Sequence, residues 1–304
     1  MKKIFKLTEA DFRGIKVCPL CGGGARKVLR LQNSIDIYTK IYPKYSLEVP
    51  PSFASRELFS CLDCGLVYWG LIPKLEALPS YQHEILDYGF NESRALQKKA
   101  ETLNRLLPTD GTLVDIGACK GELLKAVRAL NQSVLLIGIE PSFEMNFQKD
   151  DIKIIKALFD FELPLEANSV DLFSAVDVFE HLPHLDKAFS AINFFLKKEG
   201  GYVFIETPDG AYSFNKKIDY NNMNLFWIEH FSFLTRDSIK FICDRYGYDP
   251  ILVKNLGHSL TSSFSRVKSM CKSFVKNGIS NVKNPMYINS SDHLRVVLKK
   301  RAVV

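Results

Sequence analysis

The chain has 304 residues, 46% of them hydrophobic, which is ordinary for a globular protein and allows one large domain and a small one. The two lysines near the start are not followed by the apolar run of a secretion signal, and no later stretch is long enough to cross a membrane. We therefore expect a cytoplasmic protein. The net charge of +6 is unevenly distributed along the chain. From Gly257 onward there are nine Lys/Arg and one acidic residue, whereas the first 256 residues together carry a net charge of about −2.

Four of the seven cysteines form two CxxC pairs near the start of the chain. The pairs stand in "VCPLCGG" and "SCLDCGLVYW" and consist of Cys18 with Cys21 and Cys61 with Cys64. Each pair with its glycine is a knuckle that turns two thiolates onto one ion, and two knuckles complete a tetrahedron. In a cytosolic chain this pattern indicates a metal rather than disulfides. We predict a zinc-ribbon module over residues 1–78, whose closed site stabilises the fold and does not catalyse.

From about residue 92 the chain alternates amphipathic helices with apolar strands, which indicates a doubly wound parallel sheet. Helical patterns cover residues 92–107, 121–130 and 235–247, and strand candidates cover 112–117, 133–140, 152–158, 169–176 and 200–208. Two further strand candidates, 249–257 and 293–301, flank a basic insert at about 259–291. We expect these two to form an antiparallel pair at the sheet edge, within a second domain over residues 79–304.

The first strand-to-helix turn, "LVDIGACKGELL", has bare backbone at Gly117 and Gly121 just after Asp115. Ligands of such sheets bind at the carboxyl ends of the strands, where this turn lets a ligand approach the backbone. The spacing differs from that of dinucleotide and phosphate loops, and a carboxylate at Asp115 suits a cationic group better than phosphate. The second strand ends in Glu140, which is placed to accept hydrogen bonds from both hydroxyls of a ribose. A ligand with ammonium, sulfonium and ribose groups is S-adenosylmethionine.

At these residues the sequence resembles the class I S-adenosylmethionine-dependent methyltransferases. The matching segments lie within about residues 80–258 and are "DIGACKG", "GIEPS", "VDLFSAVDVFEHLPHLDKAF", "GGYVFIETPD" and "WIEHFSFLTRDSIKFICDRYGY". The chain is similar to bacterial enzymes that place a cysteine-rich zinc module before this fold, many of which act in sugar, surface-polysaccharide or secondary-metabolite pathways. The resemblance implies an α/β fold with a Rossmann-like, doubly wound, seven-stranded sheet and a small N-terminal zinc ribbon.

The resemblance also assigns cofactor-binding roles by position. It implies Asp115, Gly117, Ala118 and Gly121 at the methionine end of the cofactor, Glu140 at the ribose, Leu158 at the adenine, and Val176 and Asp177 along the pocket.

Candidate catalytic groups gather in "VDVFEHLPH", where Asp177, Glu180 and His181 would share one face if the segment is helical. His230, in "WIEHFSF", follows the fifth strand and is expected at the same rim. One interpretation is acid–base catalysis by His181 or His230 with Asp177. A second is a divalent ion at all four residues, as the similar order in plant small-RNA 2′-O-methyltransferases and ubiquinone-pathway O-methyltransferases implies. A structural role for Glu180 and His181 is the third.

We predict an enzyme that transfers a methyl group from S-adenosylmethionine to oxygen, nitrogen or carbon of a small, anionic, sugar-like or nucleotide-linked acceptor. The basic tail would suit a phosphorylated substrate. One alternative is an RNA 2′-O-methyltransferase with a divalent ion, although the stretch between Cys18 and Cys64 has no basic stripe for nucleic acid. Another is a non-catalytic, zinc-stapled binding protein, which the presence of both Gly117 and Glu140 disfavours. No pattern in the sequence specifies the acceptor atom or an oligomeric state.

Overall fold

A computed structural model of the chain describes residues 3–31, 45–78, 93–142, 147–149, 151–211, 227–256 and 293–302. The predicted basic insert at about 259–291 lies outside these described residues, as does most of the segment between the fifth strand and Trp227.

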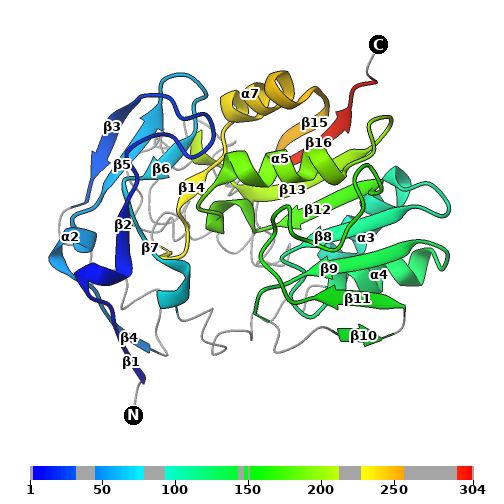
Figure 1. Cartoon of the computed structure of the whole chain (residues 1–304), viewed down its shortest axis with the longest axis horizontal. Coiled ribbons are helices and arrows are strands. Elements are labelled where there is room, and N and C mark those ends of the chain that lie inside the picture. The colour runs from blue at the N-terminus through cyan, green and yellow to red at the C-terminus, as the bar shows by residue number, and fades with distance from the viewer. Residues whose placement is uncertain are drawn as a thin grey trace, which may run out of the picture.

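The larger part of the molecule is an eight-stranded sheet with the order β10-β11-β9-β8-β12-β13-β16-β15 (Figure 1). Its strands are β8 (Thr112–Ile116), β9 (Leu135–Ile139), β10 (Phe147–Lys149), β11 (Ile152–Ile155), β12 (Leu172–Val176), β13 (Tyr202–Pro208), β15 (Tyr248–Leu256) and β16 (His293–Lys300). The five strands from β11 to β13 are mutually parallel. The predicted doubly wound, seven-stranded arrangement is therefore confirmed, and the short β10 extends it at one edge.

The last two strands form the expected antiparallel pair, with β16 inserted between β13 and β15 and antiparallel to both. Because β16 runs against its neighbours, its first residue lies beside the carboxyl end of β13, where His293 pairs with Pro208. The start of β16 is thus brought to the ligand-binding edge of the sheet.

Helices cover both faces of the sheet, so strand side chains that point to either face are buried. The helices are α3 (Ser93–Leu106), α4 (Glu122–Leu130), α5 (Leu185–Phe195) and α7 (Arg236–Tyr246). Along β13, Val203 and Ile205 join the apolar cluster under α5 and α7, while Phe204 joins the cluster under α3 and α4. Both faces of a parallel sheet are covered in this way. Within the part of the chain that the structure describes, no helix is both long and apolar enough to cross a bilayer.

The N-terminal module is built from short elements. They are β1 (Lys3–Lys6), η1 (Glu9–Asp11), β2 (Phe12–Gly14), β3 (Ala25–Arg30), β4 (Tyr45–Glu48), α2 (Pro51–Ala54), β5 (Glu57–Cys61), β6 (Val67–Trp69), β7 (Leu71–Pro73) and η2 (Leu75–Ala77). β3, β5 and β6 form an antiparallel sheet whose fourth strand is β14 (Ser232–Phe233), which lies far along the chain. The sheet of the module therefore includes residues that follow β13 of the large sheet, as Figure 1 shows.

The module also shares its core with the large sheet. Cys18, Cys61, Cys64 and Tyr68 belong to the same buried cluster as the apolar residues of α5 and α7. Apolar area buried across this junction ties the two parts together.

Candidate functional site

The four predicted metal ligands come together. The Sγ atoms of Cys18 and Cys64 are 3.5 Å apart, those of Cys21 and Cys61 are 3.3 Å apart, and all four lie within 4.8 Å of one another. Tetrahedral zinc with Zn–S bonds of about 2.3 Å requires sulfur–sulfur separations of about 3.8 Å. The thiols of Cys18 and Cys64 share a hydrogen bond, which lowers the pKa of Cys18 to about 6 and raises that of Cys64. The cluster fits a structural zinc ion.

Glycines explain how each knuckle turns. Gly22 and Gly65 have φ angles of +76° and +69°, which side-chain-bearing residues rarely adopt. Their amides donate to the carbonyls of Cys18 at 2.9 Å and Cys61 at 3.2 Å. These bonds close the two turns around the cysteine cluster.

The glycine loop follows β8 and bends over the end of β9. Gly117 has a φ of +71°, and its amide donates to the carbonyl of Ile139 at 2.8 Å. A Cβ atom on Gly117 would lie 2.5 Å from Cγ2 of Val178, so a side chain cannot be placed there without movement. Gly121, with a φ of +74°, begins α4. The absence of a side chain at Gly117 thus allows Val178 to pack against the loop at the carboxyl end of β8.

Glu140 lies directly beside this loop. One carboxylate oxygen accepts a hydrogen bond from the amide of Cys119 at 2.9 Å, and the other accepts from the amide and hydroxyl of Ser142 at 3.0 and 2.6 Å. A carboxylate offers about four lone-pair positions, so this arrangement leaves one for a ligand hydroxyl. Gly117 and Glu140 line the same edge of the sheet, a precondition for a nucleoside site.

The other predicted cofactor residues occupy different environments. Asp115 is buried below the loop, where its Oδ1 accepts from Ser174 at 2.6 Å; burial, then the charge of Glu140, raise its pKa to about 7. Ala118 is buried, Val176 packs in the cluster under α3 and α4, and Leu158 is 47% exposed. The exposed Leu158 is available to the flat face of a base.

The segment after β12 does not form the α-helix on which a shared face for Asp177, Glu180 and His181 would depend. Asp177 has a φ of +54°, and only a short 3-10 turn, η4 (Phe179–His181), follows it. Candidate ligand atoms of Glu180, His181 and His230 lie within 4.8 Å of one another. The structure therefore groups three of the four predicted residues and turns Asp177 elsewhere.

Burial controls the protonation of this group. Glu180 is 1% exposed, and burial together with the charge of Asp177 raises its pKa to about 8. Its Oε2 accepts from the hydroxyl of Thr207 at 2.9 Å. Burial lowers the pKa of His181 to about 4, so this imidazole is neutral near pH 7.

The backbone selects the tautomer of His181. Its Nδ1 lies 3.0 Å from the carbonyl oxygen of Glu229, which can only accept, so Nδ1 carries the proton and donates. Nε2 then keeps its lone pair. The ring of His230 meets that of His181 edge to face, with centroids 4.8 Å apart. A lone pair on a neutral, buried imidazole is suited either to take a proton or to bind a metal ion.

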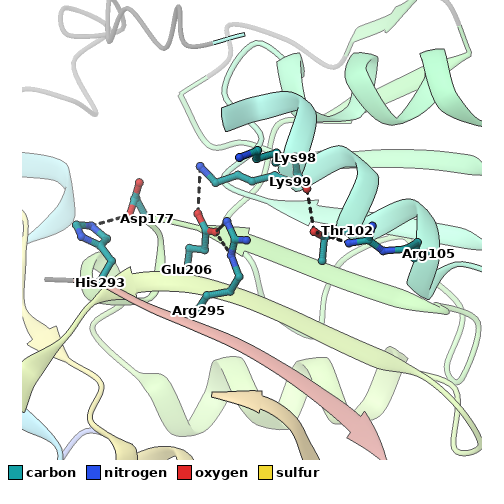
Figure 2. Close-up of polar contacts among 8 residues, drawn as sticks. All are labelled: Lys98, Lys99, Thr102, Arg105, Asp177, Glu206, His293 and Arg295. Carbon is teal, nitrogen blue, oxygen red and sulfur yellow. Dashed lines mark hydrogen bonds and ion pairs between the residues drawn. The ribbon is translucent and has the colours of Figure 1, made fainter. Parts of the chain in front are cut away.

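Figure 2 shows a second polar cluster at this edge, which the sequence analysis did not identify. His293 Nε2 lies 3.4 Å from Oδ1 of Asp177. Nearby, Glu206 pairs with Lys99 of α3 at 3.1 Å and with Arg295 of β16. The sequence signal that could have located His293 is the antiparallel pairing of the last two strands, which places the start of the final strand at the ligand-binding edge.

The fold and this edge define a class I methyltransferase, and comparison with known families agrees. The model described as "Methyltransferase domain" matches residues 90–253, more than half of the 304 residues. The chain belongs to this family. The predicted class, an S-adenosylmethionine-dependent methyltransferase, is thereby confirmed.

Solved structures with a similar fold include several methyltransferases. One is the putative methyltransferase complexed with the Trm112 activator from Haloferax volcanii, with 14% identity and a TM-score of 0.48 over 68% of this chain and 94% of that chain. Another is a putative sarcosine dimethylglycine methyltransferase from Galdieria sulphuraria, with 16% identity and a TM-score of 0.47 over 69% and 87%. A third is geranyl diphosphate C-methyltransferase from Streptomyces coelicolor A3(2), with 14% identity and a TM-score of 0.46 over 67% and 76%. No curated protein matches the sequence.

Proposed function

We propose that the protein transfers the methyl group of S-adenosylmethionine to a small, sugar-like or nucleotide-linked acceptor. The observation that carries the proposal is the juxtaposition of two groups of residues at one sheet edge. The first, the cofactor half, is the loop 117–121 with Glu140. The second, the acceptor half, is Asp177 with the Glu180–His181–His230 group and His293. The sugar-like class of acceptor comes from the family resemblance, and the acidic and imidazole groups suit an acceptor with hydroxyl or amine groups.

The cofactor half fits the nucleoside in shape and in chemistry. The glycine loop lies at the carboxyl end of β8, where ligands of such sheets bind, and Glu140 beside it supplies an acceptor for a ribose hydroxyl. S-adenosylmethionine, when bound, supplies a methyl group on a positively charged sulfur. The carboxylate of Glu140, on the same side of the site, favours that charge through space.

The acceptor half supports transfer by holding and deprotonating the acceptor. Transfer is an in-line displacement, so positioning provides most of the acceleration. As the acceptor oxygen or nitrogen forms its bond to the methyl carbon and the sulfur–carbon bond breaks, the proton of the acceptor passes to Nε2 of His181. The bond from Nδ1 to the carbonyl of Glu229 keeps the lone pair on Nε2, and the charge of Asp177 stabilises the imidazolium that forms against the cost of its burial. His230, packed against His181, is the alternative base.

A second candidate, a divalent-ion mechanism, is favoured by the Glu180–His181–His230 group. Its ligand atoms are close enough for one ion, and among the described residues Oε1 of Glu180 is buried without a hydrogen-bond partner. An ion there would orient vicinal hydroxyls and lower the pKa of the acceptor. This candidate extends the resemblance to RNA 2′-O-methyltransferases. Loss of turnover on removal of a labile ion, with zinc retained at the cysteines, would favour it over a metal-free base.

The proposal is tested by calorimetric titration with S-adenosylmethionine. Wild-type protein is expected to bind, and Glu140→Ala is expected to weaken binding by about 30- to 100-fold, since a charged hydrogen-bond acceptor is lost. Glu166→Ala, which removes an exposed carboxylate, is the matched control and should bind as wild type. Release of S-adenosylhomocysteine is then measured across nucleotide-sugars and short RNAs. Absence of binding by the wild-type protein would refute the proposal.

A further inference from the structure

The two cysteine knuckles contact the segments that carry the acceptor half. In the first knuckle, the carbonyl of Pro19 accepts from the amide of Asp186 at 3.1 Å, in the first turn of α5 and five residues after His181. In the second knuckle, the carbonyl of Gly65 accepts from the hydroxyl of Thr235 at 3.0 Å, at the start of α7. The module is therefore attached on both sides of the segment that leads to His230.

A continuous path of backbone bonds connects the second knuckle with the catalytic candidates. The amide of Cys61 donates to Leu66 at 2.8 Å, and β6 follows directly. The amide of Trp69, in β6, donates to the carbonyl of Phe231 at 2.9 Å. The amide of Phe231 in turn donates to the carbonyl of Glu180 at 2.7 Å. The segment that carries His230 is thus held between the zinc module and η4.

The cofactor half is held differently. Among the described residues, its loop and Glu140 make hydrogen bonds to Ile139 of β9 and Ile155 of β11, to Ser142 and Lys125, and within the loop itself. These elements belong to the large sheet and not to the module. Movement of the module would therefore act first on the acceptor half, to which it is hydrogen-bonded, and would reach the cofactor half through packing such as that of Val178 against Gly117.

We infer that the cysteine module positions the acceptor half of the active site. Its metal orders β6, β6 fixes Glu229–Phe231, and this segment sets the position of Glu180, His181 and His230. That the positioned residues act in catalysis rests on the proposed function. The structural link between the cysteine module and the Glu229–Phe231 segment does not. A strand of two residues such as β14 has little stability of its own, so its place depends on the strand with which it pairs.

The test compares the full-length zinc-loaded protein with Cys64→Ala, which removes one ligand. Hydrogen–deuterium exchange is followed in peptides covering 179–182 and 227–235, and in peptides covering 112–121 and 135–140. Protection of the first pair should fall by at least about tenfold, while the second pair stays unchanged. Cofactor affinity by calorimetry should stay within about threefold, and turnover should fall about 100-fold because the catalytic groups are misplaced. Cys243→Ala controls for loss of a buried thiol outside the cluster.

A second variant tests the link with zinc in place, in case loss of zinc unfolds the chain. Thr235→Val removes the hydroxyl that bonds to Gly65, and Thr235→Ser keeps it. Because Thr235 also caps α7, Ser238→Ala serves as the control, since it removes the hydroxyl that bonds to Thr235 but leaves the Gly65 contact. Only Thr235→Val should accelerate exchange at 227–234, by about threefold or more; the amide of Thr235 is left out because Ser238 accepts from it directly.

Two results would overturn the inference. One is unchanged exchange around Phe231 in folded, zinc-free protein. The other is an equal loss of protection in both pairs of peptides, which would mean that zinc holds the whole fold and not one half of the site. If the wild-type protein neither binds cofactor nor turns over, the proposed function fails, but the exchange measurement still decides the mechanical link.

Discussion

The two halves of the site differ in how the chain builds them. The cofactor half is formed by one loop and the end of the adjacent strand, within residues 115–142, and its principal contacts run between β8 and β9. The acceptor half collects residues from η4, from the segment before β14, and from the start of β16. The cofactor half lies within one short stretch of the chain and keeps its geometry as long as that stretch folds. The acceptor half depends on every one of the distant elements that position its residues. Cofactor binding and methyl transfer should therefore be separable by mutation.

The largest separation is expected from His181→Gln and His230→Gln. Loss of the group that accepts the proton should lower turnover by about 10²- to 10⁴-fold, while cofactor affinity stays within about threefold. Steady-state kinetics and calorimetry on the same preparations provide the two readouts. His184→Gln, at the start of α5 and 3.4 Å from Arg13, is the control. Retained turnover in both variants would remove the imidazoles from the mechanism.

Asp115→Asn tests the electrostatics beneath the cofactor half. The pKa of Asp115 is about 7 in the folded protein, above its ordinary value of 3.8, so the folded state binds more protons between these values. Wild-type stability should therefore fall as pH rises from about 4 to 7, and this loss is absent in the variant. The difference in the free energy of unfolding, variant minus wild type, should therefore rise by up to about 4 kcal/mol between pH 4 and pH 8. Urea unfolding without cofactor measures this, and a constant difference would contradict the prediction.

Gly117→Ala and Gly121→Ala separate close packing from backbone strain within the loop. Both residues have positive φ, but an added Cβ would lie 2.5 Å from Val178 at position 117 and 3.5 Å from Ile154 at position 121. Gly117→Ala should weaken cofactor binding by about 100-fold and Gly121→Ala by about tenfold or less. The double variant Gly117→Ala with Val178→Ala should recover part of the loss in calorimetry. No recovery would show that contact with Val178 is not the cause.

The two ion-pair variants Lys99→Met and Lys197→Met are expected to have the smallest effects. The side chains of Lys99 and Glu206 are 16% and 8% exposed, so loss of the cation leaves a buried carboxylate that still pairs with Arg295. We expect a loss of about 1–2 kcal/mol in the free energy of unfolding. Lys197→Met breaks a pair with Asp171 whose lysine is 45% exposed, and should cost less than about 1 kcal/mol. Equal effects in denaturant unfolding would show that burial does not govern these pairs.

The same contrast explains which features the sequence predicted. The alternation of strands and helices, the glycine loop and the acid at the end of the second strand could be anticipated because each is encoded by a contiguous segment with a recognisable period or spacing. The cysteine cluster could be anticipated because two CxxC knuckles together supply the four thiolates that one tetrahedral metal site requires.

The acceptor half was only partly predictable. Asp177 turns away from Glu180 and His181 because its positive φ replaces a helical start, which no periodicity reveals. His293 reaches Asp177 only through the insertion of β16, and β14 is too short to produce an alternating pattern. Such features arise from tertiary pairing and become visible only when the strands are assembled.

The pairing of Ser232 with Tyr68 also affects the biogenesis of the protein. Three strands of the module, β3, β5 and β6, leave the ribosome early, but the edge of β6 stays uncovered until β13 and the segment after it have been synthesised. Contacts between such distant positions form late in folding. A fragment that ends before β14 would therefore expose an unpaired strand edge, so the cysteine module is not a cassette that can be transplanted unchanged to another protein.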